Sequence, residues 1–175
     1  MGRIDEIMLR IQERILFWRP VPALRLSKIA AAHRLWSDSQ RREGVRAVLS
    51  GDNLKGANLA KAELPGADLS GADLTASTMS RSNLRHADLS SARLYRAELC
   101  DADLRHGKLS GAQAADADLS RADLSLADLS RARMTGALLR SASLFRASLK
   151  GAELAGADLS GADLREANLS QADLN

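Results

Sequence analysis

Leucine recurs every fifth residue through most of this chain, a period that neither an α-helix nor a β-strand has. In "GADLSGADL", residues 66–74, the leucines are Leu69 and Leu74, and the spacing continues to Leu174. On a helix, five residues advance by about 500°, so successive leucines would wind around the surface. On a strand, an odd spacing places successive leucines on opposite faces. Neither structure buries all of these leucines in one core.

An alanine usually precedes each leucine by two positions, as Ala67 precedes Leu69 and Ala72 precedes Leu74. Residues two apart on an extended segment point to the same side. The other three residues of each repeat are mostly polar or glycine. We therefore predict short extended pieces with alanine and leucine inside, separated by turns, so that the chain coils around one axis. The predicted core includes Leu69, Leu74, Leu84, Leu89, Leu104 and Leu119.

The register holds for 26 repeats, centred on Leu49 to Leu174, and 23 of the centres are leucine. Nine repeats carry glycine two positions after the centre, where a type II turn needs a positive φ. Serine follows the centre in nine of thirteen odd repeats but in only one even repeat. This alternation favours an even number of sides, and four is the smallest that encloses a core. The prediction is a 20-residue coil, about six and a half coils and a rod roughly 30 Å long.

The repeated motif closely resembles that of the pentapeptide repeat proteins. It reads alanine, aspartate or asparagine, leucine and two variable residues, as in "GANLAKAELPGADLSGADL" and "GADLSGADLREANLSQADL". The resemblance covers about residues 47–175. It implies an all-β solenoid, a right-handed quadrilateral β-helix, and association of two copies through the C-terminal coil. It also implies the activity for which the family is best known, binding DNA gyrase and related topoisomerases by mimicking DNA and protecting them from inhibitors.

The first 46 residues have no counterpart in the repeat and are expected to be helical. Ile4, Ile7 or Met8, Ile11, Ile15 and Trp18 follow the spacing of an amphipathic helix, which Pro20 and Pro22 should end. Ser27 is expected to cap a second helix, and Asp38 or Ser39 to start a third. Two interpretations stay open: a lid over the first coil, or a basic segment, residues 4–18, that contacts a membrane surface or a partner.

Composition argues against catalysis and against a cofactor or metal. The sequence holds no phosphate-binding loop and no zinc-ligand spacing, and a rod with an aliphatic core offers no catalytic pocket. His86 and His106 should stack one coil apart, but no further ligand joins them. The single cysteine, Cys100, should point outward as a free thiol and suits a cytoplasmic location. Gly107 and Ala114 remove volume from one coil, a gap that Met134 could partly fill.

Charge separates two functional interpretations. A 30 Å stretch of B-DNA carries about 18 negative charges, whereas residues 49–175 carry fifteen Lys or Arg and seventeen Asp or Glu, a net charge of −2. Residues 1–48 have a net charge of +5. The balance favours a structural or protein-interaction rod over the DNA-mimicking alternative. Direct binding of nucleic acid is not expected.

One face of the predicted rod combines cations with apolar side chains. Its centres are Leu64, Leu84, Leu104, Leu124, Leu144 and Leu164. Arginine and aromatic side chains are enriched at interface hot spots, so this face is the predicted partner-binding site; the alternative is a solvated, solubilising face. The candidate residues are Arg85, His86, Arg105, His106, Leu126, Phe145, Arg146 and Arg165.

Overall fold

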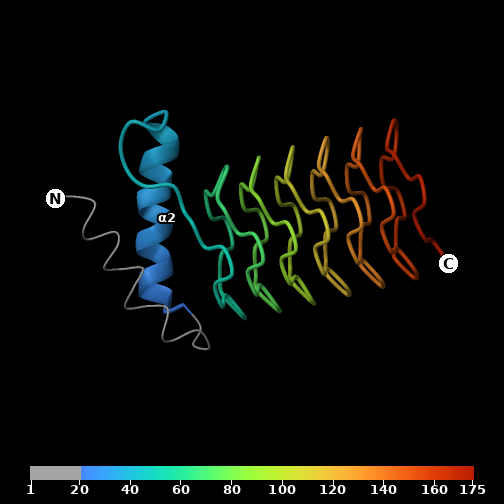
Figure 1. Cartoon of the computed structure of the whole chain (residues 1–175), viewed down its shortest axis with the longest axis horizontal. Helices are drawn as coiled ribbons and strands as arrows, with labels where there is room; N and C mark the ends of the chain where they lie inside the picture. The colour runs from blue at the N-terminus through green and yellow to red at the C-terminus, as the bar shows by residue number, and fades with distance from the viewer. Residues whose placement is uncertain (1–20) are drawn as a thin grey trace.

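The computed structural model describes residues 21–175, in which one helix leads into a stack of short coils (Figure 1). Helix α2 covers Ala23–Asp38. The coils are joined by isolated parallel β-bridges, from Val48 with Asp68 to Glu153 with Asp173, and every bridge pairs residues 20 positions apart. Since each repeat has five residues, this pairing agrees with four repeats per coil and four sides per rod.

The core lies along the axis of the coils and consists of the central leucines and the alanines two positions before them. The six leucines predicted for the core are at most 1% exposed. Fully burying one leucine side chain stabilises the fold by about 1.5–3 kcal/mol. This repeated contribution compensates for the nearly complete lack of aromatic side chains in the core.

The turns between sides have the predicted geometry. All 25 residues two positions after a centre, up to Gln171, have φ between 54° and 72°. The next N–H closes each turn, as Asp52 N–H donates to the Leu49 carbonyl at 3.1 Å, which together with the positive φ is typical of type II. Only nine of these residues are glycine; the others adopt a conformation that costs roughly 1–2 kcal/mol. As far as Arg146, each of these others also donates its N–H to a carbonyl of the next coil.

The aspartate or asparagine before each centre has a structural role. Its Oδ1 accepts the backbone N–H two residues further on, as Asp68 does from Ser70 at 3.1 Å and Asp118 from Ser120 at 2.9 Å. This contact turns the chain locally in the manner of an Asx motif. Many of the acids that could imitate phosphates on the surface are therefore engaged in shaping the coil.

The smaller residues of the irregular coil leave little empty space. Ala114 and Met134, one coil apart, are both buried. A Cβ added to Gly107 would lie 3.3 Å from Cδ1 of Leu109, so that leucine already occupies part of the missing methyl's space. The packing adjusts locally around these substitutions.

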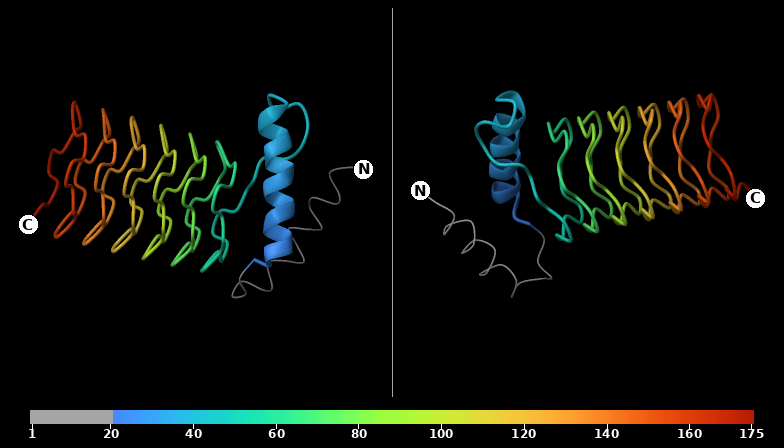
Figure 2. Two further views of the ribbon diagram at one scale, coloured as in Figure 1. Left: turned by 180° about the vertical axis from the view of Figure 1, so that it is seen from behind. Right: turned by 45° about the horizontal axis from the view of Figure 1, so that its top comes forward.

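Helix α2 lies across the N-terminal end of the coil stack (Figures 1 and 2). Leu26 is buried in the common core, and Val21 donates its N–H to the Asn53 carbonyl at 2.9 Å. His33, fully buried, bonds to backbone groups of Pro65 and Ala47. The helix therefore covers the apolar end of the first coil. Among residues 21–175, no helix is both long and apolar enough to cross a membrane.

The expected cap at Ser27 is wrong. Helix α2 begins four residues earlier, after Pro22, whose φ of −58° and ψ of 141° place it just outside the helix. Proline is tolerated at a helix start because its missing N–H has no partner there in any case. Ser27 lies within the first turns and donates its hydroxyl to the Leu24 carbonyl at 2.9 Å.

The expected third helix at Asp38 or Ser39 is also wrong. Asp38 is the last residue of α2. Gln40 N–H donates to the Ser37 carbonyl at 3.2 Å and Arg41 N–H to the Trp36 carbonyl at 2.7 Å, the two bonds of a Schellman motif. The chain is thus turned back at this point. The amphipathic helix expected over residues 4–18 lies outside the described residues.

Candidate functional site

The eight candidate residues occupy two adjacent columns along one edge of the rod, here called the candidate face. Each second turn residue donates its N–H to the first turn residue one coil further on. His86 donates to the Arg105 carbonyl at 3.0 Å, and Leu126 to the Phe145 carbonyl at 2.9 Å. Arg146 donates in the same way to the Arg165 carbonyl at 3.0 Å. The backbone therefore fixes the order and spacing of these side chains.

The two histidines stack as predicted. The rings of His86 and His106 are 4.7 Å apart and inclined by 13°. Burial, the charges of His106 and Arg85, and a smaller effect of Arg41 lower the pKa of His86, against the opposing charge of Asp103. His86 is therefore largely neutral near pH 7. In the described part of the chain, no three His, Cys, Asp or Glu side chains gather as a metal site would require.

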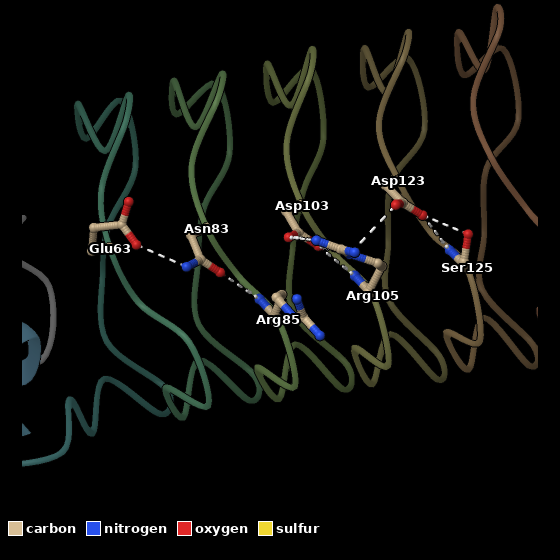
Figure 3. A network of polar contacts seen from close by, with 7 residues as sticks. All are labelled: Glu63, Asn83, Arg85, Asp103, Arg105, Asp123 and Ser125. Carbon is tan, nitrogen blue, oxygen red and sulfur yellow. Dashed lines mark hydrogen bonds and ion pairs between the residues drawn. The ribbon is translucent and has the colours of Figure 1, made fainter. Parts of the chain in front are cut away.

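Arg105 is held by two carboxylates (Figure 3). It donates through Nε to Oδ1 of Asp103 at 2.8 Å and through Nη2 to Oδ2 at 2.6 Å, and its Nε lies 3.4 Å from Oδ2 of Asp123. Burial alone would raise the pKa of Asp103, but the hydrogen bonds and charge of Arg105 lower it overall. Arg105 is thus a fixed, partly neutralised group.

Arg85 is bound differently, because the residue two positions before it is asparagine. Asn83 accepts the Arg85 backbone N–H at 3.3 Å and donates through Nδ2 to Glu63 at 2.8 Å (Figure 3). The Arg85 guanidinium makes no ion pair with any residue of 21–175. It is the cation of the candidate face that is most available to a ligand.

In the C-terminal half of the candidate face, arginine side chains lie over the aromatic ring and pair with a carboxylate. The guanidinium of Arg146 lies 4.9 Å from the Phe145 ring centre and that of Arg165 lies 5.9 Å from it. Arg146 pairs with Glu166 at 2.7 Å. Phe145 is half-buried, so the expected exposed aromatic is shielded, whereas Leu126 is 45% exposed.

Sequence reasoning did not anticipate how the arginines pair. Arg165 repeats the pattern of Arg105: its Nη2 binds Asp163 at 2.8 Å. In both repeats the letters are "DLR", and residues two apart on an extended segment share a side. This short pattern was the available signal. The exposed Tyr95, with Arg96 at 4.9 Å from its ring centre, is a further aromatic outside the candidate face.

The Cys100 thiol has low reactivity. Its Sγ donates to Oδ2 of Asp118 at 2.9 Å, and it is only half-buried. Burial, this hydrogen bond and the negative charge of Asp118 raise the pKa of the thiol to about 11. The thiolate is the reactive form, so Cys100 is a poor nucleophile near neutral pH.

The family model for pentapeptide repeats matches this chain in eight copies, within residues 45–81, 53–90, 67–105, 82–120, 108–144 and 142–175. The chain therefore belongs to the pentapeptide repeat family, as its motif indicates. The match supports the expected β-helical solenoid, because this family is built of structural repeats. No catalytic family is indicated. No curated protein matches the chain.

Solved structures similar to this chain are themselves pentapeptide repeat proteins or a resistance protein. HetL, involved in heterocyst differentiation regulation in the cyanobacterium Nostoc sp. strain PCC 7120, is 30% identical, with 73% of this chain and 78% of HetL covered and a TM-score of 0.26. A protein of the Arabidopsis thaliana thylakoid lumen is 28% identical, with 70% and 71% covered and a TM-score of 0.33. A trypsin-treated variant of QnrB1, a plasmid-mediated fluoroquinolone resistance protein, is 21% identical, with 73% and 79% covered and a TM-score of 0.42.

Proposed function

We propose that this protein is a non-enzymatic interaction module of the cytoplasm, a rigid β-helical rod that binds a protein partner along the candidate face. The observation that carries the proposal is the pair of columns containing Arg85, the stacked histidines and exposed Leu126. Backbone bonds between coils hold these groups in place before binding. Prearranged side chains lose little conformational entropy when a partner docks.

Mixed chemistry supports a protein as the ligand. Interface hot spots combine arginine and aromatic side chains with apolar contacts. The candidate face offers Arg85, whose guanidinium has no ion pair within residues 21–175, beside the neutral imidazole of His86 and, two coils on, the apolar Leu126. The cations over Phe145 could exchange their intramolecular contacts for carboxylates of a partner.

The test compares two variants with the same change in charge. Arg85→Glu with Arg105→Glu alters the candidate face, and Arg131→Glu with Lys150→Glu alters two exposed residues on another side of the rod. Affinity capture from the native cell, with mass spectrometry, should lose a specific protein only with the first pair, while circular dichroism shows that both variants remain folded. Capture that survives the first pair and also Phe145→Ser would place the partner elsewhere.

The DNA-mimicking alternative has a direct assay. Acids of the rod are engaged by neighbouring cations, as Asp101 is by Arg121 at 2.7 Å and Asp73 by Arg93 at 3.8 Å. This pairing weakens the negative field that a DNA mimic needs. We expect no protection of gyrase supercoiling from a quinolone at modest excess of the protein. Dose-dependent protection would make gyrase the partner.

Association of two copies through the C-terminal coil is a further part of this proposal. Leu174 is 55% exposed, and the leucines at 159, 164 and 169 are only partly buried. Exposed apolar side chains next to a strand edge favour association. Sedimentation should show a dimer that Leu174→Glu dissociates; a monomer at high protein concentration would exclude it.

A further inference from the structure

The loop after α2 and the coils beneath it line an open pocket of about 530 Å³. A volume of this size is within the range of small-molecule sites. One wall comes from the end of the helix and the other from the N-terminal end of the candidate face. The pocket is lined by Trp36, Ser37, Gln40, Arg41, Pro65, Gly66, Arg85 and His86.

Among the described residues, the lining of this pocket carries positive charge and no carboxylate. Neither Arg41 nor Arg85 forms an ion pair within the described part of the chain; Arg41 instead lies over the Trp36 ring, 5.3 Å from its centre. After burial and the charge of His106, both arginines contribute to lowering the pKa of His86, opposed by Asp103. Two arginines from separate parts of the fold therefore both contribute positive charge to this pocket.

The backbone that places Arg41 is strained. Gln40 and Arg41 have φ of 55° and 72°, although neither is glycine. Each residue held in this region costs of order 1–3 kcal/mol and persists only where the surroundings fix it. The loop is fixed by the Arg41 bond to Trp36 and by Gly44, where an added Cβ would lie 2.4 Å from the Ala32 carbonyl oxygen.

We propose that this pocket binds the phosphoryl group of a small anionic molecule between Arg41 and Arg85. A guanidinium presents parallel N–H donors that match phosphate oxygens, and such bonds are among the strongest hydrogen bonds in proteins. Trp36 and Gly66 form the apolar side of the pocket, where a Cβ at residue 66 would lie 4.0 Å from the indole. The pocket shares Arg85 and His86 with the candidate face, whereas Arg41 lies outside that face, so a change at Arg41 tests the pocket separately from protein binding.

The experiment uses Trp36 as its own reporter. The chain has two tryptophans, so Trp18→Phe in the full-length protein leaves a single indole in the pocket. Inorganic phosphate and pyrophosphate are titrated at constant ionic strength, with chloride as the reference anion. We expect saturable quenching of Trp36 fluorescence by at least pyrophosphate. No saturable response to either probe would overturn the proposal.

Two charge-removing variants distinguish specific binding in the pocket from general attraction of anions to a basic protein. Arg41→Ser should weaken pyrophosphate binding by about tenfold or more, the factor expected for one charge-assisted contact. Arg131→Ser, which removes an equal charge elsewhere, should not. Equal weakening by both would mean attraction by net charge only and would overturn the proposal. Phe145→Ser, on the candidate face but outside the pocket lining, should leave pyrophosphate binding intact, and this distinguishes the pocket from the partner surface.

A thermal shift provides a second readout that does not depend on fluorescence. A ligand that binds only the folded state raises the melting temperature. Pyrophosphate should raise it for the parent and for Arg131→Ser, and not for Arg41→Ser. A shift that is identical in all three proteins would also overturn the proposal.

Discussion

Nδ1 of His33 accepts a hydrogen bond from the backbone N–H of Ala47 at 2.8 Å. Because that nitrogen is an acceptor, the ring proton is on Nε2, which donates to the Pro65 carbonyl at 3.0 Å. The neutral ring therefore links α2 to two points of the first coil. A second proton on the ring would face the Ala47 N–H and break this link.

The link predicts a pH-dependent stability. Burial lowers the pKa of His33 below 6.5 despite the bond to Pro65. The free energy of unfolding should therefore be fully developed above about pH 6.5 and fall as the pH drops below it, because the unfolded chain takes up the proton more readily. Denaturant unfolding at several pH values measures this loss.

The control for this prediction is a pair of glutamine variants. Glutamine at residue 33 can accept and donate hydrogen bonds but cannot titrate in this range. His33→Gln should flatten the dependence of stability on pH, whereas His86→Gln, at an exposed residue, should retain most of it. A slope unchanged by His33→Gln would show that other groups cause the effect.

Leu89→Ala should destabilise the fold by about 2–5 kcal/mol, since it leaves a cavity in a closely packed core. Leu89 is fully buried. Arg85→Ala in the neighbouring repeat removes no ion pair within residues 21–175 and should change stability by no more than about 0.5 kcal/mol. Urea unfolding compares the two, and equal losses would contradict the inward register.

Asp88 tests the structural role of the acid before the centre. Its Oδ1 accepts the Ser90 N–H at 3.0 Å. Asp88→Asn keeps an oxygen at that position, whereas Asp88→Ala leaves the N–H without it and should cost about 1 kcal/mol. Thermal unfolding should rank the alanine variant below the asparagine variant. Equal losses in the two variants would mean that the charge, and not the acceptor, is what matters.

Cys100 should react slowly with a maleimide at neutral pH, because its pKa of about 11 leaves almost all of the group as thiol. Asp118→Asn removes the neighbouring negative charge and should increase the rate in the native protein. Asp128→Asn, at the equivalent position of another side, serves as the control. A rate that is the same in all three proteins would contradict the assigned cause.

The core could be predicted from the sequence residue by residue, whereas the surface contacts could not. Burial follows from side-chain volume and a five-residue period, so Leu69 or Leu119 could be assigned without coordinates. The ion pair between Arg105 and Asp103 could have been predicted from their two-residue spacing. The contact of Arg105 with Asp123 could not, because it depends on how the coils pair. The candidate face was predicted as a set of residues, and the partial neutralisation of its cations was not.

The junction with α2 depended on packing that no local signal encodes. Ser27 has the chemistry of a cap, yet Pro22 fixes where the helix starts. Gln40 and Arg41 adopt positive φ without glycine to mark the turn. The pocket formed by Trp36 and Arg85 joins residues far apart in sequence, so it appears only when the helix is placed on the coils.

In every bridge the two residues are 20 positions apart, so insertions and deletions of different lengths have unequal consequences. Removing residues 107–126 would shorten the rod by one coil and leave each later side chain in its own column. Removing only five residues would preserve the leucine pattern but turn everything beyond the cut by a quarter of a revolution. Phe145 and Arg165 would then lie on a different side from Arg85. The rod therefore tolerates changes in length in steps of five, but its surface keeps its identity only in steps of twenty.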